Sequence, residues 1–245
     1  MNGESQKKLA HMNHENTIMK AMILAAGHGT RMRPLTNHTP KPLLKVGGKP
    51  LIIWHIENLK QAGFKDIIIN IAWLGDQIPA ALGDGSQFDV NLHYSDEQNE
   101  GALETAGGIV KALPLLGDET FLVVNGDVWC DYLYSTQNPL KDSDQAHLIL
   151  VNNPEHNLEG DFSLSKQRVD DEDNSHDKHT FSGIGYYHPS LFNSLPTGKL
   201  ALAPILRKAM QENKVSGELF EGDWLDIGTP ERLEKLNLRL LASSN

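Results

Sequence analysis

The sequence predicts an α/β fold: one mostly parallel sheet flanked by helices, followed by a second, more antiparallel lobe. Two observations support this. Over the first 145 residues, short and continuously apolar runs alternate with segments of helical periodicity, as in a buried parallel sheet. Beyond that point, strand-like segments separated by polar loops replace the alternation. We therefore expect a loose polar tail over residues 1–18 and one domain over residues 19–245, divided into parts 19–145 and 146–245.

Apolar runs, and the glycine and proline residues that bound them, predict the strands and helices of the first part. Lys20–Ala26 is a continuous apolar strand ended by Gly27, and residues 50–62 form a helix that Pro50 can begin and Gly63 can close. Connections of this strand–helix–strand kind give a mostly parallel sheet. The further elements expected here are strands at Ile67–Ile71, Val90–Tyr94 and Phe121–Val124, and helices at Asp76–Leu82 and Glu104–Leu113.

The second part is expected to contain fewer helices. The polar stretch Asp170–His179 contains acids and histidines, but a solvated hairpin loop explains it better than a metal site. In the final helix Thr229 is the expected N-cap and Pro230 the first helical residue. The other elements predicted here are strands at Ala146–Val151 and Thr180–Tyr187 and a helix at Leu202–Gln211.

Composition limits the classes of function. The chain has 245 residues, is 39% hydrophobic and carries a formal net charge of −10, which argues against nucleic acid as a partner. Cys130 is the single cysteine, so neither a disulfide framework nor a cysteine-based zinc site is expected, and a reducing cytoplasm is the natural setting. No apolar run is long enough to cross a membrane. His11 and His14 lie in the polar tail, where rigid support for a metal is not expected.

A glycine-rich loop follows the first strand, in the sequence LAAGHGTRMRPLT. It is not a dinucleotide loop, because Met32 stands where the third glycine would be, and it lacks the Gly-Lys-Ser/Thr of a Walker loop. Gly27 and Gly29 could let backbone N–H groups approach a phosphate, and Arg31 adds a planar cation. The side chain of Lys41 extends from a stiff, proline-flanked segment nearby. A surface turn with exposed cations remains the alternative at this point.

Two aspartates suggest a metal site. Asp127 follows the apolar strand Phe121–Val124, and Asp226 lies between the apolar residues Leu225 and Ile227, where an unpaired carboxylate is costly. Two carboxylates beside a phosphate ligand suit Mg²⁺. Two separate structural aspartates are the alternative.

Hydrolase chemistry is less consistent with the sequence. No Gly-x-Ser-x-Gly elbow is present, and Cys130 has no evident histidine partner. His55 and His147 are better explained as satisfied structural residues than as ligands. A glycosidase-like carboxylate pair would leave Arg31 and Lys41 without a role.

Taken together, these segments resemble the signature of the sugar-1-phosphate nucleotidylyltransferases. The resemblance covers nearly everything from Met19 to the last helix. It is carried by long, ordered motifs, which are Leu24–Thr36, Pro40-Lys41-Pro42, Leu103–Gly108, Asn125-Gly126-Asp127 and Trp224–Thr229.

The resemblance implies a Rossmann-like fold, Mg²⁺ as cofactor, and a reaction in which a nucleoside triphosphate and a sugar 1-phosphate give a nucleotide sugar and pyrophosphate. It also implies four catalytic residues, Arg31, Lys41, Asp127 and Asp226, of which Asp127 and Asp226 hold the metal. The nucleotide-binding residues that it implies are Leu24, Ala26, Gly27, Gly29, Thr30, Arg31, Lys41, Glu104, Thr105 and Asn125. The attacking phosphate oxygen is already anionic near neutral pH, so no protein nucleophile is needed.

Finer motifs resemble the branch of this family that uses UTP and N-acetylmuramate 1-phosphate in peptidoglycan recycling. Among them are Asn70–Gly75, Asn153–His156 and Phe181–Ile184. This branch implies sugar-phosphate contacts by Asn153, Gly160 and Asp161. Mannose-1-phosphate or glucose-1-phosphate with GTP, TTP or UTP is the nearest alternative, and a non-catalytic regulatory module is a remote one. A monomer or weak homo-oligomer is expected.

Overall fold

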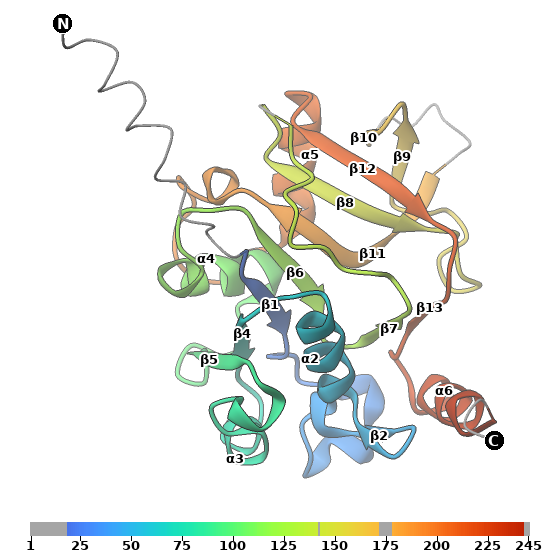
Figure 1. The fold of residues 1–245 in the computed structure, drawn as a ribbon. Helices are drawn as coiled ribbons and strands as arrows, with labels where there is room; N and C mark the ends of the chain where they lie inside the picture. Colours follow the sequence, from blue (N-terminus) through green and yellow to red (C-terminus); the bar gives the residue numbers. More distant parts are fainter. Residues whose placement is uncertain (1–18, 142, 172–177, 243–245) are drawn as a thin grey trace, which may run out of the picture.

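The computed structural model describes residues 19–141, 143–171 and 178–242 (Figure 1). Within them, nine strands form one sheet in the order β5-β4-β1-β6-β11-β8-β12-β10-β9, and two small two-stranded sheets pair β13 with β7 and β2 with β3. The predicted tail, with His11 and His14, and most of the polar stretch Asp170–His179 lie outside the described residues. The expectations for those segments therefore stay predictions.

The first part has the predicted strand–helix alternation, and its strands β5, β4, β1 and β6 are parallel neighbours. Strand β1 stops at Leu24, two residues before the predicted end, because the Ala25 N–H donates to the side chain of Asn70 and not to a backbone carbonyl of a neighbouring strand. The elements here are β1 (Ala21–Leu24), α2 (Leu51–Gln61), β4 (Asp66–Ile71), α3 (Gln77–Leu82), β5 (Asn91–Asp96), α4 (Glu104–Leu116) and β6 (Phe121–Asn125).

The second part adds its strands to the same sheet. β11 is antiparallel to both β6 and β8, β12 is parallel to β8, and β9 and β10 form an antiparallel edge. The predicted shift from parallel to more antiparallel pairing therefore occurs where β11 meets β6. The elements are β8 (Ala146–Val151), β9 (Phe162–Ser165), β10 (Arg168–Asp170), β11 (Lys178–Tyr187), α5 (Leu202–Gln211) and β12 (Val215–Phe220). The sequence analysis did not anticipate β9, β10 or β12.

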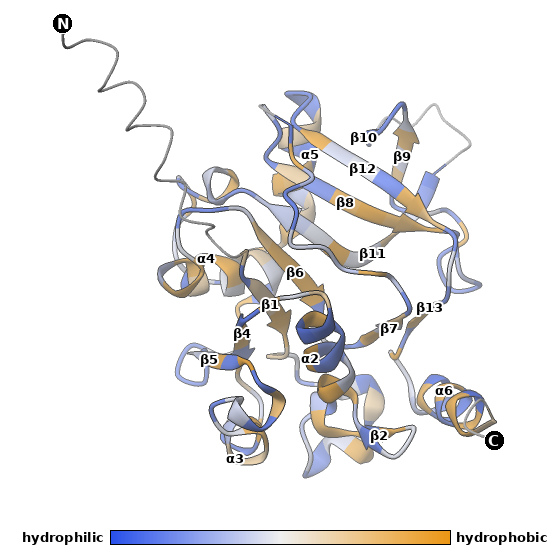
Figure 2. Cartoon of the chain, viewed as in Figure 1, coloured by the Kyte–Doolittle hydropathy of each residue, from blue (hydrophilic) through white to orange (hydrophobic). Residues whose placement is uncertain are grey.

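Two apolar cores cover the two faces of the sheet. Side chains alternate along each strand, so that Ala21 and Ile23 of β1 join the core beneath α2 and α3, while Met22 joins the core beneath α4 and α5. The central strands β1 and β6 are accordingly hydrophobic (Figure 2). Burial on both faces explains why the parallel strands read as uninterrupted apolar runs.

A third, smaller core joins the two ends of the domain. It contains Met32 and Val46 from the first loop region, Leu51 at the start of α2, and Ile227 and Leu236 from the C-terminal segment. The remaining elements are β2 (Lys45–Val46), β3 (Lys49–Pro50), β7 (Val128–Cys130), β13 (Trp224–Asp226), α6 (Pro230–Ala242) and short 3-10 turns at Thr30–Met32, Leu35–Asn37, Lys41–Leu43, Ser86–Phe88 and Pro189–Leu191.

Helix α6 begins as predicted, with the Thr229 side chain accepting a hydrogen bond from the Arg232 N–H at 3.4 Å. It lies beside the first loop region (Figure 1), where the Gly47 N–H donates to Asn237 Oδ1 at 2.9 Å. Among the described helices, none combines the length and apolar character that crossing a membrane requires.

Candidate active site

Two adjoining cavities form one cleft at the carboxyl ends of β1, β4 and β6, where an open parallel sheet places its ligands. They share Gly27, Lys41, Ala102, Glu104 and Asp127 in their walls. Every residue predicted to bind nucleotide lines one or both of them. The predicted set is Leu24, Ala26, Gly27, Gly29, Thr30, Arg31, Lys41, Glu104, Thr105 and Asn125.

The loop after β1 is held open by Gly29. This glycine has φ +59°, and a Cβ there would lie 2.9 Å from Thr36 Cγ2. Its carbonyl accepts the Thr36 hydroxyl at 2.7 Å and the Met32 N–H at 2.9 Å, which fixes the turn that carries Thr30 and Arg31. Gly27 is exposed, with nothing near its Cβ position. The loop thus presents exposed backbone and a guanidinium beside the cleft, the groups a triphosphate requires.

Lys41 reaches across the cleft to Asp127. Its Nζ lies 2.8 Å from Asp127 Oδ2, and only 11% of its side chain is exposed. The preceding Pro40 is extended and Lys41 begins a 3-10 turn, so the proline-flanked segment is ordered as predicted. The largely buried Lys41 side chain, like its partner Asp127, therefore lies where the two cavities meet.

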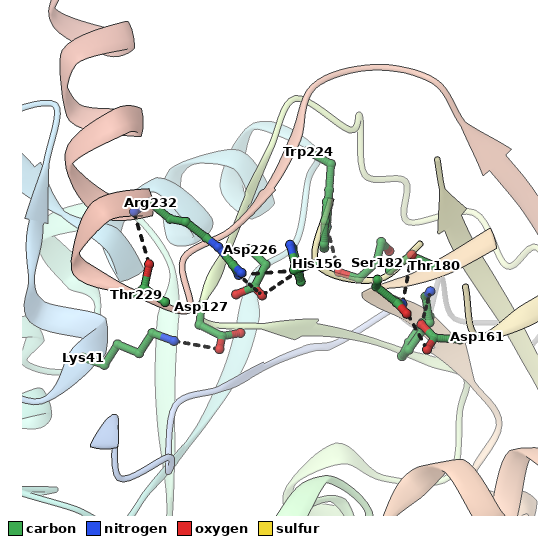
Figure 3. A network of polar contacts seen from close by, with 12 residues as sticks. Lys41, Asp127, His156, Asp161, Thr180, Ser182, Trp224, Asp226, Thr229 and Arg232 are labelled. Carbon is green, nitrogen blue, oxygen red and sulfur yellow. Dashed lines mark hydrogen bonds and ion pairs between the residues drawn. The ribbon is translucent and has the colours of Figure 1, made fainter. Parts of the chain in front are cut away.

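Asp226 lies on the strand next to Asp127. β13 pairs antiparallel with β7, and the Ile227 N–H donates to the Asp127 carbonyl at 2.7 Å, which places the two aspartates at the same strand ends. Asp226 Oδ2 accepts from Arg232 at 2.7 Å and lies 3.3 Å from His156 Nε2 (Figure 3). Each predicted metal ligand thus has a cationic side chain beside it in the chain's own structure.

The donor set fits Mg²⁺. Asp127 lines the cleft that carries the phosphate-type loop, and Asp226 lies beside it on the neighbouring strand segment. Mg²⁺ usually takes one or two carboxylates together with phosphate oxygens and water. Within the described residues, no group of three or more His, Cys, Asp or Glu side chains could hold a metal by itself. A metal held by the two aspartates would therefore complete its coordination with water or phosphate oxygens.

His55 is buried beneath the Asp127 turn. Burial lowers its pKa from 6.5 to about 4, against the opposing pull of the nearby Asp127 carboxylate, so the ring is neutral at physiological pH. The prediction of a structural histidine is right in location, but the ring is not fully satisfied: Nε2 has no hydrogen-bond partner among the described residues. His147, by contrast, contacts Ser216 Oγ through Nδ1 at 3.0 Å.

Cys130 is not an activated thiol. It is buried, and burial raises its pKa, which disfavours the thiolate that a nucleophile needs. Its Sγ lies 4.0 Å from the Tyr134 hydroxyl.

The residues predicted to contact the sugar phosphate hold the loop between β8 and β9. Asn153 Nδ2 donates to the carbonyls of Leu158 and Lys178 at 3.1 and 2.9 Å, and Asp161 Oδ2 accepts the Phe181 N–H at 2.8 Å. Gly160 has φ +69°, and a Cβ there would lie 2.7 Å from the Lys178 backbone. These three residues do not line the two cavities, and their sugar contacts stay predictions.

Sequence reasoning gave no role to Arg232, His156 or Glu97. Arg232 occupies the first turn of α6, six positions after Asp226, so the predicted N-cap at Thr229 could have directed attention to it. Glu97 directly follows β5 and lines the cleft, and the rule that ligands bind at strand ends could have found it. His156 reaches Asp226 from a distant loop, and no local pattern indicates that contact.

Known proteins are similar to this chain over most of its length. The N-acetylmuramate alpha-1-phosphate uridylyltransferase of Neisseria meningitidis is 56% identical over 223 residues, covering 89% of this chain and 96% of that protein. The Caulobacter vibrioides protein of the same name is 32% identical over 86% of this chain and 92% of its own length. A mannose-1-phosphate guanyltransferase from Aspergillus oryzae is 30% identical, and the match covers 93% of this chain and 68% of that protein.

Solved structures show the same fold. A Bacillus anthracis protein described as a glucose-1-phosphate thymidylyltransferase superposes with a TM-score of 0.77 at 23% identity, covering 91% of this chain and 95% of that one. HddC from Yersinia pseudotuberculosis gives a TM-score of 0.73 at 22% identity, covering 91% and 99%. The family model for nucleotidyl transferases matches residues 20–162. The predicted family is thereby confirmed, and the chain belongs to the nucleotidyl transferases.

Proposed function

We propose that this chain transfers the uridylyl group of UTP to N-acetyl-α-D-muramate 1-phosphate, giving UDP-N-acetylmuramate and pyrophosphate in peptidoglycan recycling. The observation that carries the proposal is the 56% identity to the Neisseria meningitidis N-acetylmuramate alpha-1-phosphate uridylyltransferase, which extends over 96% of that protein. The mannose-1-phosphate guanyltransferases match at about half that identity. UTP as substrate makes the cytoplasm the proposed compartment. A monomer or weak homo-oligomer stays a prediction.

The reaction is an in-line displacement at the α-phosphorus of UTP. An oxygen of the sugar phosphate bonds to that phosphorus while the bond to the bridging oxygen breaks and pyrophosphate leaves with the electron pair. The nucleophile is anionic near neutral pH, so positioning and charge neutralisation are the main requirements. Neither the buried thiol of Cys130 nor the neutral ring of His55 is needed.

The residues of the cleft have separate tasks in this proposal. The exposed turn with Gly29, Thr30 and Arg31 holds the triphosphate, and Lys41 contacts the α-phosphate. Leu24, Ala26 and Gly27 meet the base and ribose through backbone groups. Glu104 and Thr105 at the start of α4 and Asn125 at the end of β6 line the same cavity.

Asp127 and Asp226 would hold Mg²⁺, which when bound neutralises phosphate charge and helps to align the reacting oxygens. In the chain's own structure Lys41 pairs with the first of these carboxylates and Arg232 with the second, so each negative charge is balanced and each side chain is held in place.

A substrate matrix tests the proposal. Pyrophosphate release is measured for UTP, GTP, TTP and CTP, each with the 1-phosphates of N-acetylmuramate, N-acetylglucosamine, glucose and mannose. We expect the UTP and N-acetylmuramate 1-phosphate pair to give the highest kcat/KM. Efficient turnover of GTP with mannose 1-phosphate, and none with the muramyl substrate, would falsify the assignment. Nucleotide binding without turnover of any pair would instead support a regulatory module.

A variant tests the metal role. Asp226→Asn keeps the size of the side chain and removes one anionic ligand, so Mg²⁺-dependent turnover should fall by about a hundredfold, or roughly 3 kcal/mol in transition-state stabilisation. Asp223→Asn is the matched control, since Asp223 is an exposed aspartate just before β13. Binding of Mn²⁺ with UTP, followed by electron paramagnetic resonance, should weaken in the first variant and stay unchanged in the second. Equal turnover by both variants would remove Asp226 from the metal site.

A further inference from the structure

A buried polar chain lies under the nucleotide end of the cleft. It consists of Asn70, the fifth residue of β4, and Glu97, the residue that directly follows β5. Asn70 is 3% exposed and Glu97 is fully buried. A buried carboxylate is costly to maintain unless its oxygens are hydrogen-bonded, so the partners of this pair are informative.

The contacts run in series from one wall of the cleft to the other. The Ala25 N–H, just after β1, donates to Asn70 Oδ1 at 2.7 Å. Asn70 Nδ2 then donates to Glu97 Oε1 at 2.7 Å, and Glu97 Oε2 accepts the Leu103 N–H, just before α4, at 2.9 Å. The two backbone ends of this series lie in two separate segments that contribute to the lining of the cleft, Leu24–Ala26 through all three residues and Ala102–Thr105 through Ala102, Glu104 and Thr105.

The order of donors and acceptors in the series is obligatory. The backbone N–H of Ala25 can only donate, so the amide oxygen of Asn70 must face it and the amide nitrogen must face Glu97. Glu97 in turn meets two donors, and an ionised carboxylate is the group of this size that accepts from both. Burial raises the pKa of Glu97, while the hydrogen bonds from Leu103 and Asn70 oppose that rise.

Helix α4 packs directly onto this series. A Cβ at Gly108 would lie 2.8 Å from Glu97 Oε1 and 2.9 Å from Asn70 Nδ2, so only glycine lets the helix approach this closely. The close approach of α4 to Asn70 and Glu97 therefore explains the second glycine of the pair Gly107-Gly108. The series joins the ends of β1, β4 and β5 to the start of α4.

Building on the proposed function, we propose that Asn70 and Glu97 are positioning residues for UTP: their hydrogen bonds set the spacing between the two backbone walls that hold its uridine. Neither side chain has to contact the substrate for this. A role in stability alone would also require the pair to be buried and bonded. The two explanations differ in what a folded variant does to nucleotide affinity.

Exchanging the amide of Asn70 and the carboxylate of Glu97 distinguishes a positioning role from a role in stability alone. In Asn70→Asp a second carboxylate faces Glu97, and in Glu97→Gln a donor meets a donor at either Asn70 or Leu103. When the two changes are combined, the carboxylate at position 70 accepts from the Ala25 N–H and from the amide nitrogen at position 97. The amide oxygen at position 97 then accepts from the Leu103 N–H, so the pattern is complementary again.

We expect each single variant to raise KM for UTP and weaken calorimetric UTP binding by about tenfold, with kcat and KM for the sugar phosphate changed less than about twofold. The double variant should recover to within about threefold of wild type. Asn91→Asp is the matched control, because Asn91 pairs with Asp66 across the same two strands, at their exposed opposite end. It should leave every kinetic constant unchanged.

Folded single variants that bind UTP as wild type does, or a folded double variant without recovery, would overturn the proposal. Glu97→Gln changes only charge and hydrogen bonding and decides the matter if Asn70→Asp does not fold. A failure of the proposed function appears separately, in the wild-type substrate matrix. In that case the same variants are measured with the nucleotide that wild type uses, and unchanged affinity would again contradict the role of the pair.

Discussion

Polar residues of the cleft and polar residues of the loop between β8 and β9 act differently. In the cleft Arg31 and Lys41 line the cavities, with their cationic groups in the turns that follow the first parallel strand. In the loop between β8 and β9, Asn153 and Asp161 use their polar atoms to bond to backbone groups and to a side chain of β11.

This difference shows that a polar residue in a motif can act in two ways. Substituting a residue that faces the cleft should reduce activity while leaving stability nearly unchanged. Substituting one that holds a loop should reduce stability first, and activity only through the shape of the loop. The predictions below test that division, from the largest expected effect to the smallest.

Lys41→Ala should give the largest loss of activity with little loss of stability. It removes the ammonium at the junction of the two cavities, and kcat/KM should fall by about a hundredfold, or roughly 3 kcal/mol. Lys60→Ala is the control, since it breaks a similar ion pair with Asp89 on an exposed surface, worth less than about 1 kcal/mol. Steady-state kinetics and urea unfolding check both variants. A large drop in stability in Lys41→Ala without a drop in kcat/KM would contradict the division.

His55 should make the stability of the fold sensitive to acid. Because its pKa is about 4 in the folded chain and 6.5 when unfolded, the unfolded state binds the proton first as the pH falls. The free energy of unfolding therefore keeps its full value above pH 6.5 and falls by up to about 3 kcal/mol towards pH 4. His55→Gln lacks this titration, so the stability gap between wild type and variant should narrow from pH 7 to pH 4. Parallel unfolding curves over that range would show that His55 is not the group responsible.

Asp161→Ala should affect mainly stability. It leaves the Phe181 N–H without its acceptor, which should cost about 2 kcal/mol of unfolding free energy. Glu159→Ala, an exposed carboxylate on the same loop, is the control and should change stability by less than about 0.5 kcal/mol. Any change in KM should concern the sugar phosphate and not UTP. A variant of normal stability with a raised KM for the sugar phosphate would instead place Asp161 in direct contact with that substrate.

Gly183→Ala should have the smallest effect, which combines a small loss of stability with weaker UTP binding. Gly183 has φ +80°, and a Cβ there would lie 2.5 Å from Asn125 Nδ2, so the variant combines backbone strain with a displaced cleft residue. Gly117 also has a positive φ, +88°, but nothing lies near its Cβ position, so Gly117→Ala is the control for a substitution without a displaced neighbour. We expect Gly183→Ala to be less stable than this control by about 1 kcal/mol and to bind UTP more weakly. Identical behaviour of the two variants would show that Asn125 tolerates displacement.

The predictable part of the structure is the part governed by local patterns. Strands buried on both faces, such as Phe121–Asn125, are continuous apolar runs, and α6 has a recognisable N-cap at Thr229. Strand β12 was not foreseen because Gly217 and Glu218 interrupt its apolar character, although Gly217 is required by its close approach to the Leu148 carbonyl. Hydrophobic periodicity predicts fully buried strands well, and it predicts edge strands and strands of mixed polarity poorly.

The candidate site divides in the same way. The residues expected to bind nucleotide follow from motifs of the family resemblance, and they line the cleft because these motifs lie at or near strand ends. Their individual roles stay predictions. The partners of Asp226 were not, since Arg232 and His156 reach it from a helix and a loop whose placement depends on the whole fold. Likewise, the pairing of Asn70 with Glu97 requires that β4 and β5 be known as neighbours in register.

The small core between the first loop region and α6 has a consequence for biosynthesis. Met32 and Val46 are made early, but their partners Ile227 and Leu236 follow much later in the chain. The central parallel strands can pair before those partners are made, because domains fold as their chains emerge. The placement of Asp226 and the packing of the phosphate-type loop depend on the later segment. A nascent chain could therefore already have its sheet while still lacking catalytic competence, so that synthesis and the onset of activity are separated in time.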